Sequence, residues 1–142
     1  MVDRLSPEKR SALMSRVRTR DTGPELALRK ALFAAGIRGW RLKSKLPGRP
    51  DLMFRRARVC VFVDGAFWHG HPDYYWGQSG QFWDAKIASN RERDTRVTAE
   101  LEESGWTVVR LWDFEIARDP LGCVERVRRV LDTSPSSVRP GR

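Results

Sequence analysis

The chain has 142 residues, of which 40% are hydrophobic and 32% are charged. This size and composition fit one compact domain, and they exclude a multidomain machine and a wholly disordered chain. No apolar run approaches the roughly 20 residues that a membrane span needs, and the first ten residues lack the apolar centre of a signal peptide. We therefore expect a cytoplasmic protein with no membrane partner. The two cysteines, Cys60 and Cys123, lie far apart and fit core packing better than a metal site.

The positive charge is concentrated towards the N-terminus. The formal net charge is +9, and residues 1–49 carry 13 Lys or Arg against 4 acidic residues, whereas residues 50–142 carry 14 of each sign. Of the 27 basic residues 22 are Arg, whose planar guanidinium suits bidentate contact with phosphate. The pattern favours a polyanionic partner, most simply nucleic acid, although a merely solvated basic surface has the same composition.

The first part of the chain is predicted to hold two helices and a strand. Residues 6–16 and 22–35 are typical of helices, and in the second helix Thr22 and Glu25 have the spacing of a capping box. A short strand is expected at residues 38–42.

The middle of the chain predicts a hairpin followed by a long loop. The apolar runs at residues 51–54 and 59–63 flank a basic turn at 55–58, which indicates two antiparallel strands. Residues 64–80 combine glycine, proline, histidine and aromatic residues without a regular period, and long loops of this kind tend to be functional.

The remainder predicts a helix at residues 81–104, a strand at 106–112 and a helix at 120–131. The alternation of helices and strands favours an α/β fold in which a mixed sheet has helices on its faces.

The hairpin brings acidic residues together if its turn is symmetric. Phe54 then pairs with Val59, Asp51 lies opposite Phe62, and Asp51 shares a face with Asp64. Two carboxylates at this separation can bind one hard cation such as Mg²⁺. In the loop that follows, His69 is a group that can take a proton from water near neutral pH. Taken alone, each of these residues also fits an ordinary role in a turn, a helix cap or a polar loop.

Six segments together resemble the very-short-patch (Vsr-like) DNA mismatch repair endonucleases, which are relatives of the restriction-endonuclease PD-(D/E)xK enzymes. The segments are Thr19-Arg-Asp-Thr22 with Glu25, Leu46-Pro-Gly-Arg-Pro-Asp51, Phe67-Trp-His69, Phe82-Trp83 with Lys86-Ile87, Asn90 with Glu92-Arg-Asp94, and Gly105-Trp106. The resemblance covers about residues 5 to 115 and implies a restriction-endonuclease-like three-layer α/β fold, with a central mixed sheet flanked by helices.

The resemblance also implies an activity. Enzymes of this family nick one strand on the 5′ side of the thymine in a T·G mismatch, which begins very-short-patch repair. The implied cofactor is Mg²⁺, and the implied partner is duplex DNA with a T·G mismatch, bound by a monomer. Asp51 and the carbonyl of Val63 match metal ligands, and Glu25 matches a carboxylate that binds metal-bound water. His69 matches the general base, and Asp94 matches the acid that holds it.

Other residues match the family's DNA contacts. In the family, such side chains enter the base stack or the grooves, read the mismatched bases or lie in the segment that is Leu46–Asp51 here. The matching residues are Met14, Val17, Phe67, Trp68, Trp83, Lys86, Asn90 and Arg49. We accordingly expect a basic DNA-binding helix or arm at residues 1–20, an endonuclease domain at 21–132 and a disordered tail at 133–142. Removal of residues 1–20 is expected to weaken the salt dependence of DNA binding.

Two departures from the family pattern affect metals. Asp64 stands where the family usually has a histidine, and it can act as a direct metal ligand and catalytic residue. The cysteine positions of the family's structural zinc site are Ala66, Asp73 and Phe114 here, which leaves only His71. Because zinc needs four ligands, we expect this zinc site to be absent. The loop would then be held by packing around Tyr74, Tyr75, Trp76 and Phe114.

Two other functions fit the same residues. One is a restriction-like or defence nuclease that acts on unmispaired or modified DNA. The other is a catalytically inactive mismatch-binding module, against which stands the presence of Asp51, His69, Glu25 and Asp94 together.

Overall fold

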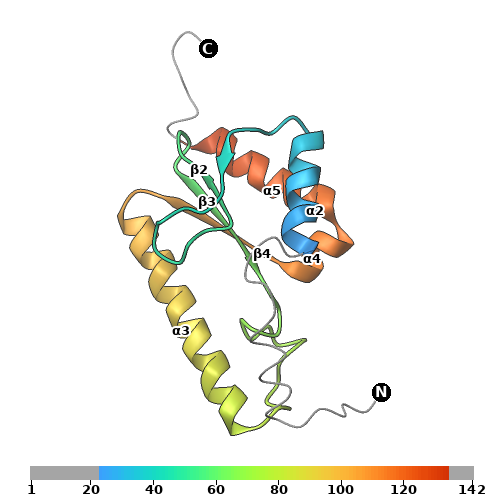
Figure 1. Cartoon of the computed structure of the whole chain (residues 1–142), viewed down its shortest axis with the longest axis vertical. Coiled ribbons are helices and arrows are strands. Elements are labelled where there is room, and N and C mark those ends of the chain that lie inside the picture. The colour runs from blue at the N-terminus through green and yellow to red at the C-terminus, as the bar shows by residue number, and fades with distance from the viewer. Residues whose placement is uncertain (1–22, 135–142) are drawn as a thin grey trace.

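The computed structural model describes residues 23–134, which form a four-stranded sheet covered by helices on both faces (Figure 1). The elements are α2 (Gly23–Ala34), β1 (Trp40–Arg41), β2 (Leu52–Phe54), β3 (Val59–Asp64), α3 (Gln81–Glu103), β4 (Thr107–Trp112), α4 (Asp113–Arg118) and α5 (Pro120–Thr133). The helix predicted at residues 6–16, the DNA contacts at Met14 and Val17, the basic arm at 1–20 and the tail at 135–142 lie outside the described residues. No helix among residues 23–134 is both long and apolar enough to cross a membrane.

The sheet is mixed, as predicted from the order of helices and strands. Its strand order is β1-β2-β3-β4, in which the first three strands are antiparallel and β4 is parallel to β3. Parallel neighbours need a crossover connection, and α3 supplies it.

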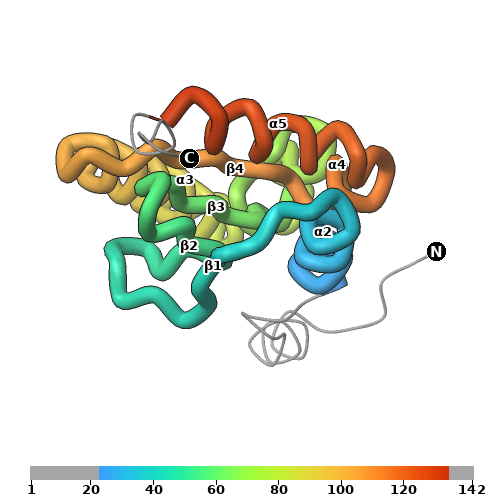
Figure 2. Tube along the Cα trace, turned by 90° about the horizontal axis from the view of Figure 1, so that it is seen from above, coloured from blue at the N-terminus to red at the C-terminus, as the bar shows by residue number. Residues whose placement is uncertain are grey.

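The strands separate two apolar layers because successive side chains of a strand point to opposite faces. In β3, Val59 and Val61 are buried against α2, α4 and α5, whereas Cys60 and Phe62 are buried against α3. Figure 2 shows α5 on one side of the sheet and the connection between β1 and β2 on the other. The three-layer restriction-endonuclease-like arrangement is therefore confirmed. Both cysteines are buried, in agreement with core packing, and burial raises the pKa of Cys60 to about 12.

The hairpin between β2 and β3 has the predicted symmetric register, with Phe54 paired to Val59 and Leu52 paired to Val61. Its turn includes Arg58 in a left-handed conformation, at φ 56°, which costs a non-glycine residue roughly 1 kcal/mol. The Arg58 guanidinium donates a hydrogen bond to the Ser104 carbonyl at 3.2 Å and lies 5.0 Å from the centroid of the Trp106 ring. These contacts tie the hairpin turn to the α3–β4 connection and offset the strain.

Most element boundaries agree with the sequence prediction to within two residues, but one helix and one helix end were not expected. Helix α4 was not expected, because six residues are too few to show a helical period. Helix α5 continues to Thr133, beyond the expected start of the tail, and Ser134 is buried and donates its hydroxyl to the Ala57 carbonyl. The C-terminal end of α5 is thus attached to the hairpin turn.

Candidate active site

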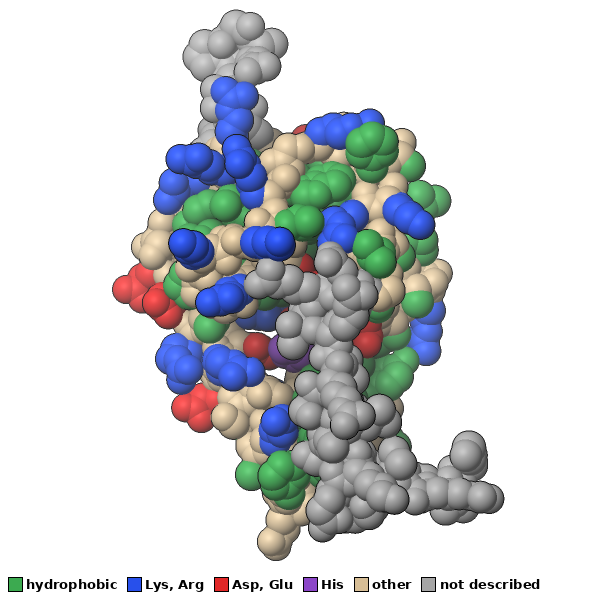
Figure 3. All heavy atoms as spheres, in the orientation of Figure 1, with side chains coloured by type: hydrophobic (Ala, Val, Ile, Leu, Met, Phe, Trp, Pro, Cys, Tyr) green, Lys and Arg blue, Asp and Glu red, His purple; other side chains and the backbone are tan. Residues whose placement is uncertain are grey.

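A cavity of about 320 Å³ opens between the β1–β2 connection, the C-terminal end of β3 and helix α3. The residues that line it are Gly48, Arg49, Asp51, Phe62, Val63, Asp64, His69, Arg93, Asp94, Val97 and Arg110. Figure 3 shows histidine and acidic side chains together at a hollow in the middle of this face. The structure therefore brings together six of the residues singled out in the sequence, from three separate parts of the chain.

Gly48 allows the β1–β2 connection to form a wall of this cavity. It has a φ of +74°, and a Cβ atom placed on it would lie 2.5 Å from Cγ1 of Val97 and 3.3 Å from the ring of Phe62. The backbone therefore rests directly on α3 and β3, which only glycine permits in this conformation. This contact places Arg49 and Asp51 at the cavity.

Asp51 and Glu25 form a buried carboxyl pair. Asp51 lies immediately before β2, and its Oδ2 accepts a 2.7 Å hydrogen bond from the backbone N–H of Val63. Glu25 is in the first turn of α2, is only 5% exposed, and its side chain is hydrogen bonded to Asp51. Burial and the contact with Glu25 raise the pKa of Asp51 to about 8, although the Val63 N–H opposes the shift. Asp51 therefore retains a proton at neutral pH. Thr22, the expected capping partner of Glu25, lies outside the described residues.

His69 and two aspartates form a second group on the α3 side of the same cavity. The Nδ1 of His69 is hydrogen bonded to Oδ2 of Asp94, which projects from α3, and its Nε2 lies 3.8 Å from Oδ1 of Asp64 at the end of β3. Burial lowers the pKa of His69, but the hydrogen bond to Asp94 and the negative charge of Asp64 outweigh burial, so the net shift is upward. An imidazole held through Nδ1 presents Nε2 as its exchangeable atom.

Arg110 connects this group to the sheet, and the sequence analysis did not single it out. Its Nη1 donates to both carboxylate oxygens of Asp64, at 3.1 and 3.2 Å, and its Nη2 donates to the Asp94 carbonyl at 3.3 Å. Its Nε donates to the Thr98 hydroxyl at 2.9 Å, and its guanidinium lies 4.2 Å from the centroid of the Phe62 ring. One side chain of β4 therefore positions β3 and α3 relative to each other.

Asp64 can bind either a metal ion or Arg110. Ligand atoms of Asp64, His69 and Asp94 all lie within 4.8 Å of one another, which is a spacing that a metal ion could use. However, both oxygens of Asp64 already accept hydrogen bonds from Arg110. Burial raises the pKa of Asp64, and the charges of His69 and Arg110 oppose that shift. The ion pair competes with direct metal binding by Asp64.

An aromatic cluster adjoins the cavity. Phe67 is in edge contact with Trp68, Tyr75 and Trp83, at centroid distances of 6.0, 5.4 and 5.8 Å, and Trp68 lies 5.5 Å from Trp83. Trp83 is only 4% exposed, whereas its neighbour Phe82 is 63% exposed. Trp83 therefore forms the buried base of the cluster, and Phe82 is the exposed ring at the start of α3.

Polar side chains of α3 border the same cluster. The Lys86 ammonium lies 5.8 Å from the centroid of the Trp68 ring, and the Asn90 side-chain amide donates to the Trp68 carbonyl at 3.0 Å. Arg93 donates to the Asn90 side-chain oxygen at 3.1 Å. Lys86 is thus exposed beside the aromatic rings, while Asn90 holds the loop against the helix.

His71 lies in a second aromatic group. Its ring centroid is 4.8 Å from that of Trp112 and 5.0 Å from that of Phe114, and Tyr74 stacks on Phe114 at 5.0 Å. Packing by Tyr74 and Phe114 agrees with the expectation for this loop. The expectation for Trp76 is wrong, because Trp76 is 70% exposed.

Sequence reasoning missed Arg110 and Phe82 for different reasons. Arg110 is the one cation within the strand Thr107–Trp112, and a charge in a half-buried strand is a signal that could have been followed. Nothing in the sequence shows which of Phe82 and Trp83 faces the loop.

The chain was compared with known proteins. The family model for the DNA mismatch endonuclease Vsr matches residues 2–75. The type II nicking enzyme V.NmeDIP of Neisseria meningitidis serogroup C is 39% identical over 137 residues, which cover 92% of this chain and 90% of that relative. The type II nicking enzyme V.XorIIP of Xanthomonas oryzae is 43% identical over 94% of this chain and 100% of the relative.

The DNA mismatch endonuclease Vsr of Escherichia coli is also similar, with 36% identity over 80% of this chain and 74% of that enzyme. These matches extend across the hairpin, the long loop and α3, which carry the cavity. A DNA-cleaving hydrolase, with DNA as its partner, follows from them together with the geometry of the site. The chain belongs to the Vsr family of DNA mismatch endonucleases.

Proposed function

We propose that the protein uses Mg²⁺ to nick one strand of duplex DNA on the 5′ side of the thymine in a T·G mismatch. The observation that carries this proposal is that one cavity is lined by Asp51, which is hydrogen bonded to the buried Glu25, and by His69 and Asp94, a histidine held by a carboxylate. The first pair can hold a cation, and the second can move a proton. These are the two chemical tasks of phosphodiester hydrolysis.

The carboxyl pair fits a hard divalent cation. Both residues supply carboxyl oxygens, Glu25 is buried, and Asp51 retains a proton that a divalent cation would displace on binding. Glu25, Asp51 and the main-chain carbonyl of Val63 would hold Mg²⁺, which when bound stabilises negative charge on a phosphate. Because Arg110 already binds Asp64, we assign Asp64 to the positioning of His69 and Arg110 rather than to the cation.

His69 acts as the general base in this proposal. Asp94 accepts a hydrogen bond from the Nδ1–H of His69, so the neutral ring keeps its lone pair on Nε2. That nitrogen can take a proton from an attacking water. After that transfer, the imidazolium lies beside two carboxylates, Asp64 and Asp94, which stabilise it.

The aromatic cluster favours a mispaired duplex over a matched one as the substrate. Phe67 and Trp68 lie in the loop that carries His69, and the exposed Phe82 lies at the start of α3; these three rings can stack on bases, and the buried Trp83 packs against all three. Pushing rings between base steps costs a few kcal/mol of stacking, and a mispaired step resists less than a sound one. Lys86 and Arg49 are exposed cations at the edge of the site that can contact the backbone phosphates.

A second candidate function keeps the chemistry and changes the target. Two of the similar proteins are described as type II nicking enzymes, a description that does not mention a mismatch. Nicking at an unmispaired or modified site is therefore the alternative.

A nicking assay separates these functions. Labelled duplexes with one T·G mismatch, with a matched T·A pair or with methylated cytosine are incubated with Mg²⁺ and the wild type, Asp51→Ala or His69→Ala. The proposal predicts one cut, 5′ of the thymine, by the wild type alone and on the mismatched duplex. Equal cutting of matched or methylated duplex supports the second candidate, and binding without cutting by all three proteins indicates an inactive mismatch-binding module.

A further inference from the structure

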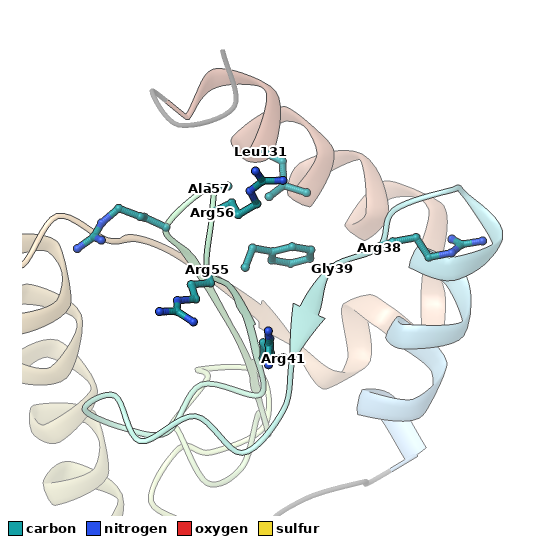
Figure 4. A pocket seen from close by; sticks show the side chains of 9 residues that line it. Arg38, Gly39, Arg41, Arg55, Arg56, Ala57 and Leu131 are labelled. Carbon is teal, nitrogen blue, oxygen red and sulfur yellow. The ribbon is translucent and has the colours of Figure 1, made fainter. Parts of the chain in front are cut away.

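A second hollow lies at the opposite end of the hairpin from the active-site cavity. It has a volume of about 650 Å³ and is bordered by β1, the β2–β3 turn and the end of α5 (Figure 4). Five of its nine lining residues are arginines, and none is acidic. The lining residues are Arg38, Gly39, Arg41, Phe54, Arg55, Arg56, Ala57, Arg58 and Leu131.

Two of the five arginines have structural partners. Arg38 donates to the Phe33 carbonyl at 2.6 Å and lies 3.5 Å from the centroid of the Phe33 ring, and Figure 4 shows it turned away from the hollow. Arg58 is engaged by Ser104 and Trp106, as described above. Arg38 and Arg58 therefore stabilise the fold through these contacts.

The other three arginines are available to a ligand. Arg41, Arg55 and Arg56 are exposed, and within residues 23–134 their guanidinium groups have no hydrogen bond or ion pair. Arg41 comes from β1 and the other two from the hairpin turn, so separate segments direct cations to one place. Three uncompensated guanidinium groups around a concave surface create a positive potential that attracts an anion.

The turn that carries two of these arginines is rigidly attached. Arg58 ties it to the end of α3, and the Ser134 hydroxyl ties Ala57 to the end of α5. Cations on an anchored turn lose less conformational entropy on binding than cations on a free loop.

The hollow lies within reach of a duplex that is seated at the active-site cavity. Asp51 and Arg55 lie at the two ends of β2, separated by about 13 Å of extended chain. Figure 3 shows Lys and Arg side chains gathered over the β2–β3 end of the sheet, on the same face as the histidine and acidic side chains. A DNA helical turn is about 34 Å long, so a duplex seated at the cavity reaches the hollow within half a turn.

We propose that Arg41, Arg55 and Arg56 bind backbone phosphates of the flanking duplex, outside the nicked base step. This inference rests on the proposed function only in that the duplex must lie across the active-site cavity. Phosphate is the ligand because the planar guanidinium fork matches its oxygens, and because phosphate contacts add affinity without reading the base sequence. The site adds affinity that is independent of base sequence and of the mismatch.

The test is the salt dependence of binding to duplexes of different length. Each lost phosphate contact is expected to reduce the slope of log K against log salt by about 0.9. Arg55→Gln with Arg56→Gln is therefore expected to reduce the slope by about 2, and the addition of Arg41→Gln by about 3. A triple Arg→Lys variant keeps the charges and is expected to retain the slope.

The matched control is Lys30→Gln with Arg129→Gln, which makes the same change in charge at two exposed positions that do not line the hollow. Thermal unfolding of each variant checks that the fold is intact. Only one flank of the duplex reaches the hollow. Shortening that flank should therefore remove the difference in slope between the wild type and the hollow variants, whereas shortening the other flank should not.

Three results would overturn the inference: an unchanged slope in the triple Arg→Gln variant, an equal loss in the Lys30 and Arg129 control, or a difference that survives shortening of either flank. The measurement is made on both matched and T·G duplexes. If the wild type binds both duplexes equally, the proposed function is contradicted, but the slopes of the variants can still be compared. Failure of the proposed function is therefore distinguishable from failure of this inference.

Discussion

At the scale of single residues, the proton retained by Asp51 links the proposed metal binding to pH. Because the pKa of Asp51 is raised to about 8 in the folded protein, the folded chain retains a proton that the unfolded chain releases near pH 4. In metal-free protein, this carboxyl therefore makes the free energy of unfolding fall as the pH rises from about 4 to about 8. A bound Mg²⁺ would replace the proton and so remove that loss.

We therefore expect the stabilisation by Mg²⁺ to increase as the pH rises from 5 to 8.5. The measurement is the melting temperature with and without Mg²⁺ at several pH values, since ligand binding to the folded state raises it. Asp51→Asn should make the Mg²⁺ effect small and independent of pH. An equal Mg²⁺ effect at all pH values in the wild type would contradict the assignment.

Asp94 controls the protonation of His69. Its hydrogen bond and charge raise the pKa of His69, so Asp94→Asn is expected to lower that pKa and to move the acidic limb of the rate–pH profile to lower pH. The maximal nicking rate should also fall, by less than the roughly 10² to 10⁴-fold expected for His69→Ala. Single-turnover rates at saturating Mg²⁺ measure both effects, with Thr95→Ala as the control. An unmoved acidic limb would show that another group determines it.

Arg110 and Asp64 form a buried ion pair whose two members cannot be removed independently. Arg110→Met leaves the Asp64 carboxylate buried without its cation, and we expect the free energy of unfolding to fall by about 3–5 kcal/mol. Asp64→Asn combined with Arg110→Met should recover most of that loss. Urea unfolding of the two single variants and the double variant measures the coupling, and additive losses would refute it.

At the scale of elements, the contact of the β1–β2 connection with α3 determines the shape of the active-site cavity. Gly48→Ala is expected to destabilise the protein by about 2–4 kcal/mol, because the added methyl group is strained by the positive φ and overlaps Val97. Gly39→Ala is the matched control, since Gly39 has a similar φ of +93° but no atom within 4 Å. Thermal unfolding of both variants isolates the effect of the overlap, and equal losses would mean that strain alone matters.

The elements that sequence reasoning predicted are those with a strong local signal. The hairpin register follows from an even turn between two apolar runs, and α3 follows from its length and its end at Gly105. Helix α4 could not be predicted because it has less than two turns, and its start depends on Glu115 accepting a hydrogen bond from the Trp112 backbone.

The site was predictable where one segment carries several of its residues. The Leu46–Asp51 and Phe67–His69 segments lead directly to the cavity. The partnership of Arg110 with Asp64 was not predictable, because it joins residues 46 positions apart through the parallel pairing of β3 and β4. The burial of Trp83 likewise depends on which side of α3 packs against the loop, a tertiary property.

At the scale of the whole molecule, aromatic packing holds the long loop to the rest of the fold. His71 lies among Tyr74, Trp112 and Phe114, and its Nδ1 accepts a hydrogen bond from the Asp73 backbone at 3.1 Å. We expect the protein to fold without zinc, so that a zinc-selective chelator leaves the melting temperature unchanged. Elemental analysis provides the second measurement, and one equivalent of tightly bound zinc would contradict the prediction.

The ion pair between Asp64 and Arg110 also restricts how this lineage can have diverged. A histidine at position 64 would leave the Arg110 guanidinium facing a group that cannot neutralise it, and an apolar residue at 110 would leave Asp64 charged and enclosed. Single-step replacement at either position therefore passes through a poorly folded ancestor. Natural sequences of this family should exchange the two positions together, and the identity of residue 64 should predict that of residue 110.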